Sequence, residues 1–119
     1  MPVQIFGVKN SQATRAAQRF FKERRTTIHM VDLKVKPMAA GEIKRFVDRF
    51  GSLAQLLDAE GKAYQDAGLA YLRVSDAQLL QRIEREPALL KLPLVRGAGN
   101  RFAIGRDEEA WKAMAAAEA

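Results

Sequence analysis

The residues with the clearest chemical potential lie together in one short segment, Asn10-Ser11-Gln12-Ala13-Thr14-Arg15. This segment follows an alternating apolar stretch that predicts a strand, and it opens a stretch that predicts a helix. Ligands of open α/β folds bind at the carboxyl ends of the strands, and the free N–H groups of a helix N-terminus favour an anion. Ser11, Thr14 and Arg15 add further donors, so the segment predicts an anion-binding loop. The alternative is that Asn10 or Ser11 only caps the helix.

The composition excludes several kinds of chemistry. The chain has no cysteine, which removes disulfides, iron–sulfur clusters, cysteine zinc sites and thiol nucleophiles. It has a single histidine, His29, so a histidine-rich metal site is excluded as well. A serine nucleophile needs a neighbouring base, and His29 falls in a predicted strand without an evident link to Ser11. We therefore predict no metal, no cofactor and no catalytic residue.

Basic residues are concentrated in the first half of the chain. Residues 1–50 carry 11 Lys and Arg against 4 Asp and Glu, whereas residues 51–119 carry 9 against 10. The densest group lies along one predicted helix and its end: Arg15, Arg19, Lys22, Arg24 and Arg25. Such a face attracts an acidic protein or an anionic small molecule, or is simply solvated. No aromatic residues are interleaved with these cations, which argues against a nucleic-acid ligand.

The first third of the chain predicts a strand, a helix and a second strand. Residues 3–6 show an alternating apolar pattern that ends at Gly7. Residues 12–24 are amphipathic, and residues 26–33 are β-branched and apolar. Two such strands joined by a helix form a βαβ unit with parallel strands.

The remaining two thirds predict a helical middle and a terminal hairpin. We expect a helix marked by Ile43 and Phe46 that ends at Gly51, followed by a short helix capped by Ser52. An irregular stretch is expected from Gly61 to Gly68. The next predicted helix begins at a Ser75 capping box and runs to Pro87. Two strands, 92–95 and 101–104, follow around a glycine-rich turn. The last helix buries Trp111, Met114 and Ala115.

These elements predict an α/β architecture, with a mixed four-stranded sheet covered by helices and a helical insert between its two halves. The length of 119 residues fits one domain spanning 1–119. No basic-then-apolar leader and no apolar run of membrane-spanning length is present. We therefore expect a soluble, cytoplasmic protein with no membrane association.

Four segments resemble the arsenate reductase-like proteins, and the likeness extends over nearly the whole chain. Residues 6–16 resemble that family's opening pattern, Tyr-Gly-x-x-Asn-Cys-x-x-Cys/Ser-Arg-Lys/Asn. The others are Ala63-Tyr64-Gln65-Asp66-Ala67-Gly68-Leu69, Leu89-Leu90-Lys91-Leu92-Pro93-Leu94-Val95 and Ile104-Gly105-Arg106. The resemblance implies a thioredoxin-like fold with an inserted helical segment and a cis peptide bond before Pro93.

The differences from the family pattern bear directly on function. Ser11 stands where the family has its cysteine thiolate, and a serine hydroxyl neither forms nor resolves a disulfide. Asp58 and Leu92 occupy the places of two oxyanion-binding arginines, so that of three family cations only Arg106 is retained. Thiol reductase activity is therefore excluded for the unaided chain. The residues left as candidate ligand contacts are Asn10, Ser11, Gln12, Thr14, Arg15, Pro93 and Arg106.

The sequence leaves two functional hypotheses open. The first is a non-catalytic binding or regulatory module, because the family includes regulators of the Spx type that bind the C-terminal domain of the RNA polymerase α subunit. In those regulators a glycine near the end of the second helix matters for that contact, and Gly51 sits in a comparable place. The reductases also have a glycine there, so Gly51 does not discriminate between the two, and its simpler interpretation is a helix C-cap. The second is a thiol-dependent reductase-type protein that binds external glutathione in the groove near Ser11 and Pro93.

Overall fold

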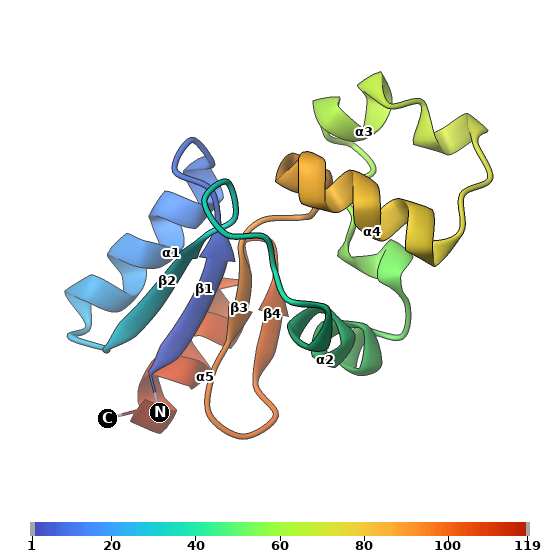
Figure 1. The fold of residues 1–119 in the computed structure, drawn as a ribbon. Coiled ribbons are helices and arrows are strands. Elements are labelled where there is room, and N and C mark those ends of the chain that lie inside the picture. Colours follow the sequence, from blue (N-terminus) through green and yellow to red (C-terminus); the bar gives the residue numbers. More distant parts are fainter. Residues whose placement is uncertain (1, 119) are drawn as a thin grey trace.

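The computed structural model describes residues 2–118, whose strands form one mixed sheet (Figure 1). The strand order is β2-β1-β3-β4, with bounds Val3–Gly7 for β1, Ile28–Asp32 for β2, Leu94–Arg96 for β3 and Phe102–Ile104 for β4. β1 runs parallel to β2 and antiparallel to β3, and β3 runs antiparallel to β4. The predicted mixed four-stranded sheet and its parallel first pair are thus confirmed.

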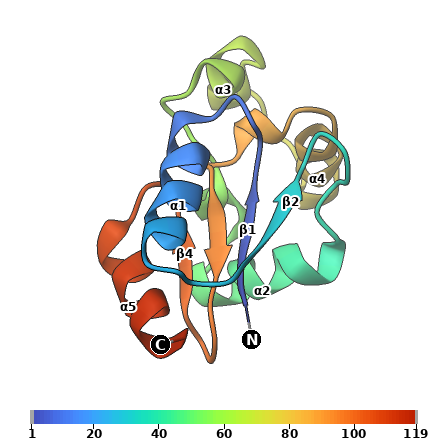
Figure 2. The same ribbon diagram turned by 90° about the vertical axis from the view of Figure 1, so that its left-hand side faces the viewer.

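Helices lie on both faces of the sheet. Helices α1 (Gln12–Glu23) and α5 (Glu108–Glu118) cover one face, and α2 (Ala40–Phe50) lies against the other beside β4 (Figures 1 and 2). Successive strand side chains point to opposite faces, so β1 contributes to two separate cores. Val3 and Ile5 pack in the core shared with α1 and α5, and Phe6 packs in the core shared with α2 and the insert.

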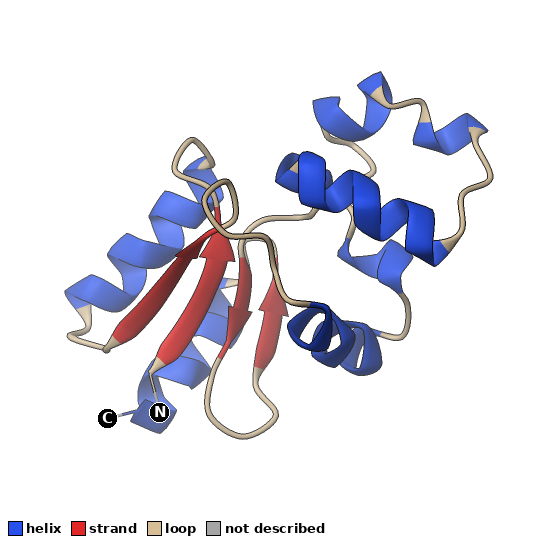
Figure 3. Ribbon diagram, viewed as in Figure 1, coloured by secondary structure: helices blue, strands red, loops and turns tan. Residues whose placement is uncertain are grey.

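The segment between β2 and β3 contains only helices and loops, as Figure 3 shows. After α2 it includes α3 (Lys62–Asp66), α4 (Asp76–Arg85) and three short 3₁₀ helices, Leu53–Leu56, Leu69–Tyr71 and Pro87–Leu89. The predicted helical insert is therefore confirmed. The stretch from Gly61 to Gly68 is not irregular as expected, because α3 occupies most of it.

Two predicted helix caps have different outcomes. Ser75 forms a complete capping box: its Oγ accepts the Gln78 N–H at 3.2 Å, and the Gln78 Oε1 accepts the Ser75 N–H at 3.0 Å. Ser52 occupies the N-cap position of its 3₁₀ helix, but its side chain makes no capping hydrogen bond. The second cap prediction is wrong, because residue type alone does not fix the side-chain direction. Gly51 ends α2 with a φ of 104°, as a C-cap glycine does.

Candidate functional site

Ser11 lies at the N-cap of α1, directly after the carboxyl end of β1. Its Oγ accepts the Thr14 backbone N–H at 3.2 Å, and its carbonyl oxygen accepts the Arg15 N–H at 3.1 Å. The capping interpretation is therefore confirmed. The hydroxyl proton takes no part in the cap, so Ser11, which is half-buried, keeps one donor for a ligand.

Thr14 does not reach the surface of the site. Its side chain is 0% exposed and packs against Gly7, where a Cβ atom would overlap the Thr14 Oγ1 and lie 2.6 Å from its Cγ2. Gly7 thus allows the first turn of α1 to approach the end of β1 closely. Thr14 positions the loop rather than contacting a ligand.

A shallow basic hollow lies beside the first two turns of α1. It has a volume of about 300 Å³ and is lined by Gln12, Arg15, Ala16, Arg19 and Arg106. The α1 residues share one exposed face because they are three, four or seven positions apart. The structure thus brings together three of the predicted contacts, Gln12, Arg15 and Arg106. It adds Arg19, which the helical spacing from Arg15 could have identified. Asn10 is exposed in the loop before the helix.

Arg106 is held near this helix by the turn that follows β4. The Gly105 N–H donates to two carbonyl oxygens, that of Lys91 at 2.9 Å and that of Pro93 at 3.0 Å. The Arg106 Nε lies 3.4 Å from the Glu108 Oε2, and both side chains are largely exposed. A surface ion pair of this kind is weak, so Arg106 remains available to an anion.

The Leu92–Pro93 peptide bond is cis, which confirms the expectation from the family resemblance. Pro93 is buried immediately before β3, and Leu92 is half-buried. Pro93 therefore shapes the loop that holds Gly105, while its own ring is removed from the surface.

Asp58 lies on a segment that pairs with the chain just before Leu92. The Asp58 N–H donates to the Leu89 carbonyl oxygen at 2.8 Å, and the Lys91 N–H donates to the Leu56 carbonyl oxygen at 2.8 Å. Asp58 and Leu92, which stand where the family pattern has two arginines, are thus held by neighbouring segments. Asp58 presents a carboxylate and Leu92 an isobutyl group, and neither attracts an anion.

His29 is exposed on β2 and lies opposite Gln4 in the β1–β2 register. Ser11 follows the other end of β1, beyond Gly7. His29 is therefore not placed to act as a base for Ser11.

Among residues 2–118, no group of three or more His, Asp and Glu side chains could hold a metal ion, and no helix is long and apolar enough to cross a membrane. The pKa of Lys62 is raised by the hydrogen bond that it donates to Asp66 and by the charge of that carboxylate. This exposed pair lies on α3 and includes none of the candidate residues.

Comparison with solved structures shows the same fold in several bacterial proteins. An arsenate reductase from Vibrio cholerae has a TM-score of 0.77 at 17% identity, over 96% of this chain and 98% of that one. A putative arsenate reductase from Yersinia pestis has a TM-score of 0.75 at 22% identity, over 90% and 95%. An ArsC family related protein from Bacteroides fragilis has a TM-score of 0.77 at 14% identity, over 96% and 98%.

These likenesses confirm the predicted thioredoxin-like architecture with its inserted helical segment. No curated protein matches the chain in sequence. The model of the ArsC family matches residues 6–114, which include every candidate residue named above. The chain therefore belongs to the ArsC family.

Proposed function

We propose that this protein is a non-catalytic member of the ArsC family that acts as a binding or regulatory module. One observation carries the proposal: the N-cap of α1, where the family pattern has a cysteine, holds Ser11 in a chain without any cysteine. A helix N-terminus activates a cysteine by stabilising its thiolate. The hydroxyl of Ser11 stays protonated near neutral pH, and His29, the single histidine of the chain, is not placed to remove its proton.

The surroundings of Ser11 support the same proposal. Asp58 and Leu92 replace two cations of the family pattern, and Asp58 adds a negative charge that repels an arsenate ion. Of the three cations in the family pattern, only Arg106 is retained. Loss of the nucleophile is thus accompanied by loss of most of the oxyanion-binding charge.

A protein partner is the first candidate ligand, and the C-terminal domain of the RNA polymerase α subunit is the specific proposal. The family resemblance motivates it, together with the exposed Gly51 at the end of α2 and the basic excess of residues 1–50. Isotope-labelled protein titrated with the purified domain is expected to show saturable amide shifts around Gly51. An absence of shifts at millimolar concentration contradicts this partner.

Glutathione is the second candidate ligand, and the basic hollow beside α1 favours it. Arg15, Arg19 and Arg106 can face the two carboxylates of the tripeptide, and the Ser11 hydroxyl can donate to its thiolate or to a carbonyl group. In this case the external thiol supplies the sulfur that the chain lacks. The protein would then bind the reductant without forming a disulfide itself.

Two measurements separate these possibilities. An arsenate reduction assay with glutaredoxin or thioredoxin is expected to give no turnover above the protein-free reaction, and turnover would overturn the non-catalytic proposal. An amide titration with glutathione then tests the second candidate. Saturable shifts confined to residues 10–15 and to Arg106 support a thiol ligand, and their absence directs attention to a protein partner.

A further inference from the structure

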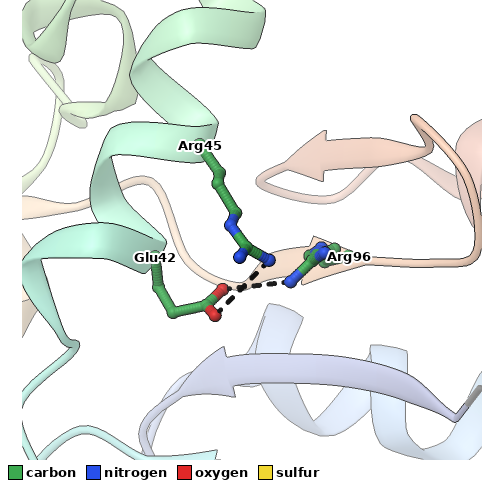
Figure 4. A network of polar contacts seen from close by, with 3 residues as sticks. All are labelled: Glu42, Arg45 and Arg96. Atoms are coloured by element: carbon green, nitrogen blue, oxygen red, sulfur yellow. Dashed lines mark hydrogen bonds and ion pairs between the residues drawn. The ribbon is translucent and has the colours of Figure 1, made fainter.

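A second cluster of arginines lies at the other end of the sheet, between α2 and β3 (Figure 4). The Arg96 Nη1 donates to the Glu42 Oε2 at 3.4 Å, and the Arg45 Nη1 lies 3.9 Å from the Glu42 Oε1. The side chains are 18% exposed for Arg96, 26% for Glu42 and 52% for Arg45. Two guanidinium groups therefore share a single carboxylate, which leaves one positive charge uncompensated.

Arg96 has donors that the fold does not use. A guanidinium carries five N–H donors, and the buried Nε of Arg96 has no hydrogen-bond partner among residues 2–118. Arg96 lies between Gln4 and Phe102 in the strand register, and its guanidinium carbon is 5.9 Å from the Phe102 ring centre. The Gln4 Oε1 is also buried without a partner.

The arginines open onto a hollow of about 520 Å³ between α2 and the β3–β4 turn, lined by Arg45, Asp48, Arg49, Arg96, Gly99, Asn100 and Phe102. Its one carboxylate, on Asp48, is engaged by Lys44 at 3.0 Å. Within residues 2–118, Arg49 has no carboxylate at ion-pair distance, and its guanidinium carbon lies 5.5 Å from the Phe50 ring centre. The hollow therefore has a positive charge excess and a free amide, that of Asn100, at its rim.

We propose that this hollow binds a phosphoryl dianion, either free phosphate or a phosphate monoester. Planar guanidinium groups match phosphate oxygens in a two-point fork, and Arg45, Arg49 and Arg96 surround the hollow. A dianion carries more charge than the Glu42 carboxylate with which it competes. Glu42 keeps Arg96 oriented in the empty state, and Arg45, at 3.9 Å, turns readily from Glu42 to the ligand.

This site is distinct from the one at Ser11. Arg96 pairs with Gln4 near the beginning of β1, whereas Ser11 follows the end of that strand. No residue lines both hollows. Ligand binding at the two ends of the sheet can therefore be observed separately in one titration.

The first test is a titration of labelled protein with inorganic phosphate and with phenyl phosphate, against sodium chloride at equal ionic strength. We expect saturable shifts in the Arg45, Arg49 and Arg96 Nε–Hε resonances and in the Asn100 side chain. Tighter binding of phenyl phosphate assigns the monoester, and tighter binding of phosphate assigns the free ion. Shifts restricted to Gln12, Arg15 and Arg106, or no saturation at either end, overturn the proposal.

The second test uses variants of exposed residues, which leave the core intact. Arg45→Gln and Arg49→Gln are each expected to weaken binding by about tenfold or more, since each removes a charged hydrogen bond. Arg73→Gln removes the same charge from an exposed position outside the hollow and is expected to leave affinity unchanged. An equal loss in Arg73→Gln would show general charge attraction and overturn the site.

The sharpest variant is Glu42→Gln. If Glu42 competes with the ligand, its neutralisation tightens phosphate binding, and phosphate raises the melting temperature of this variant more than that of the wild type. A purely structural ion pair predicts no gain in affinity. Unchanged or weaker binding by folded Glu42→Gln therefore contradicts the proposed competition and the site with it.

Discussion

Ser11 occupies the position where a nucleophile would gain most from the N-terminus of α1. Its Oγ accepts the Thr14 N–H, so its present role is to begin the helix. A cysteine at this position has neighbouring N–H groups that stabilise a thiolate. The side chain at residue 11 is therefore the first of the differences between this chain and the family pattern, and Asp58 and Leu92 are the next.

We predict that Ser11→Cys gives a reactive thiol but no arsenate reduction. The helix N-terminus lowers the pKa of the introduced thiol, so alkylation should be faster than for a free cysteine at neutral pH. Asp58 and Leu92 still leave the oxyanion without its cations. The alkylation rate tests the reactivity of the thiol, and the turnover with glutaredoxin tests arsenate reduction, with Ser11→Ala as the control. Robust turnover by the single variant would show that the missing arginines are dispensable.

Gly7 is a second position at which one residue controls the site. We predict that Gly7→Ala lowers the free energy of unfolding by about 1–3 kcal/mol, the usual cost of an overpacked core. The added Cβ would collide with Thr14 and force the first turn of α1 away from β1. Denaturant unfolding measures the loss, and Gly7→Ala/Thr14→Ala should recover part of it.

Gly41 provides the matched control for this change. It lies in α2, where an added Cβ would meet nothing within 4 Å apart from its chain neighbours and the backbone of its own helix. Gly41→Ala is therefore expected to stabilise the protein by about 0.5–1 kcal/mol through helix propensity. Equal effects at Gly7 and Gly41 would contradict the close approach of α1 and β1.

At the scale of single elements, helix caps decide where the insert begins and ends its helices. We predict that Ser75→Ala destabilises the protein by about 0.5–2 kcal/mol, because it removes the side-chain acceptor of the capping box. Ser52→Ala is the control, since Ser52 makes no capping bond. Thermal unfolding of both variants checks the difference, and a similar loss in Ser52→Ala would show that the cap itself is not the cause.

At the scale of the whole molecule, the sheet separates two cores. Trp111 fixes α5 in the core formed with α1, where its ring centre lies 5.5 Å from that of Phe20. Trp111→Ala is expected to cost about 3–5 kcal/mol. Tyr71, which is 93% exposed, is the control. Tyr71→Ala should cost less than about 0.5 kcal/mol, as surface changes usually do. A loss below about 1 kcal/mol for Trp111→Ala would place that residue outside the core, contrary to its 1% exposure.

The sequence by itself determined most of the elements and much of the architecture, although it missed α3. The periodicity of residues 3–33 predicts β1, α1 and β2, because strand and helix faces repeat at different intervals. The Ser75 capping box depends on residues three positions apart, so it too was visible in the sequence. The absence of cysteine alone excluded a thiol nucleophile in residues 1–119.

The tertiary structure decided which polar side chains meet. Thr14 and Arg15 are adjacent in the sequence, but packing against Gly7 buries the first and leaves the second in the basic hollow. Arg96 and Glu42 are 54 residues apart, and only the docking of α2 beside the sheet brings them into contact. Local periodicity specifies the face of an element, whereas contacts between distant elements depend on how those elements pack.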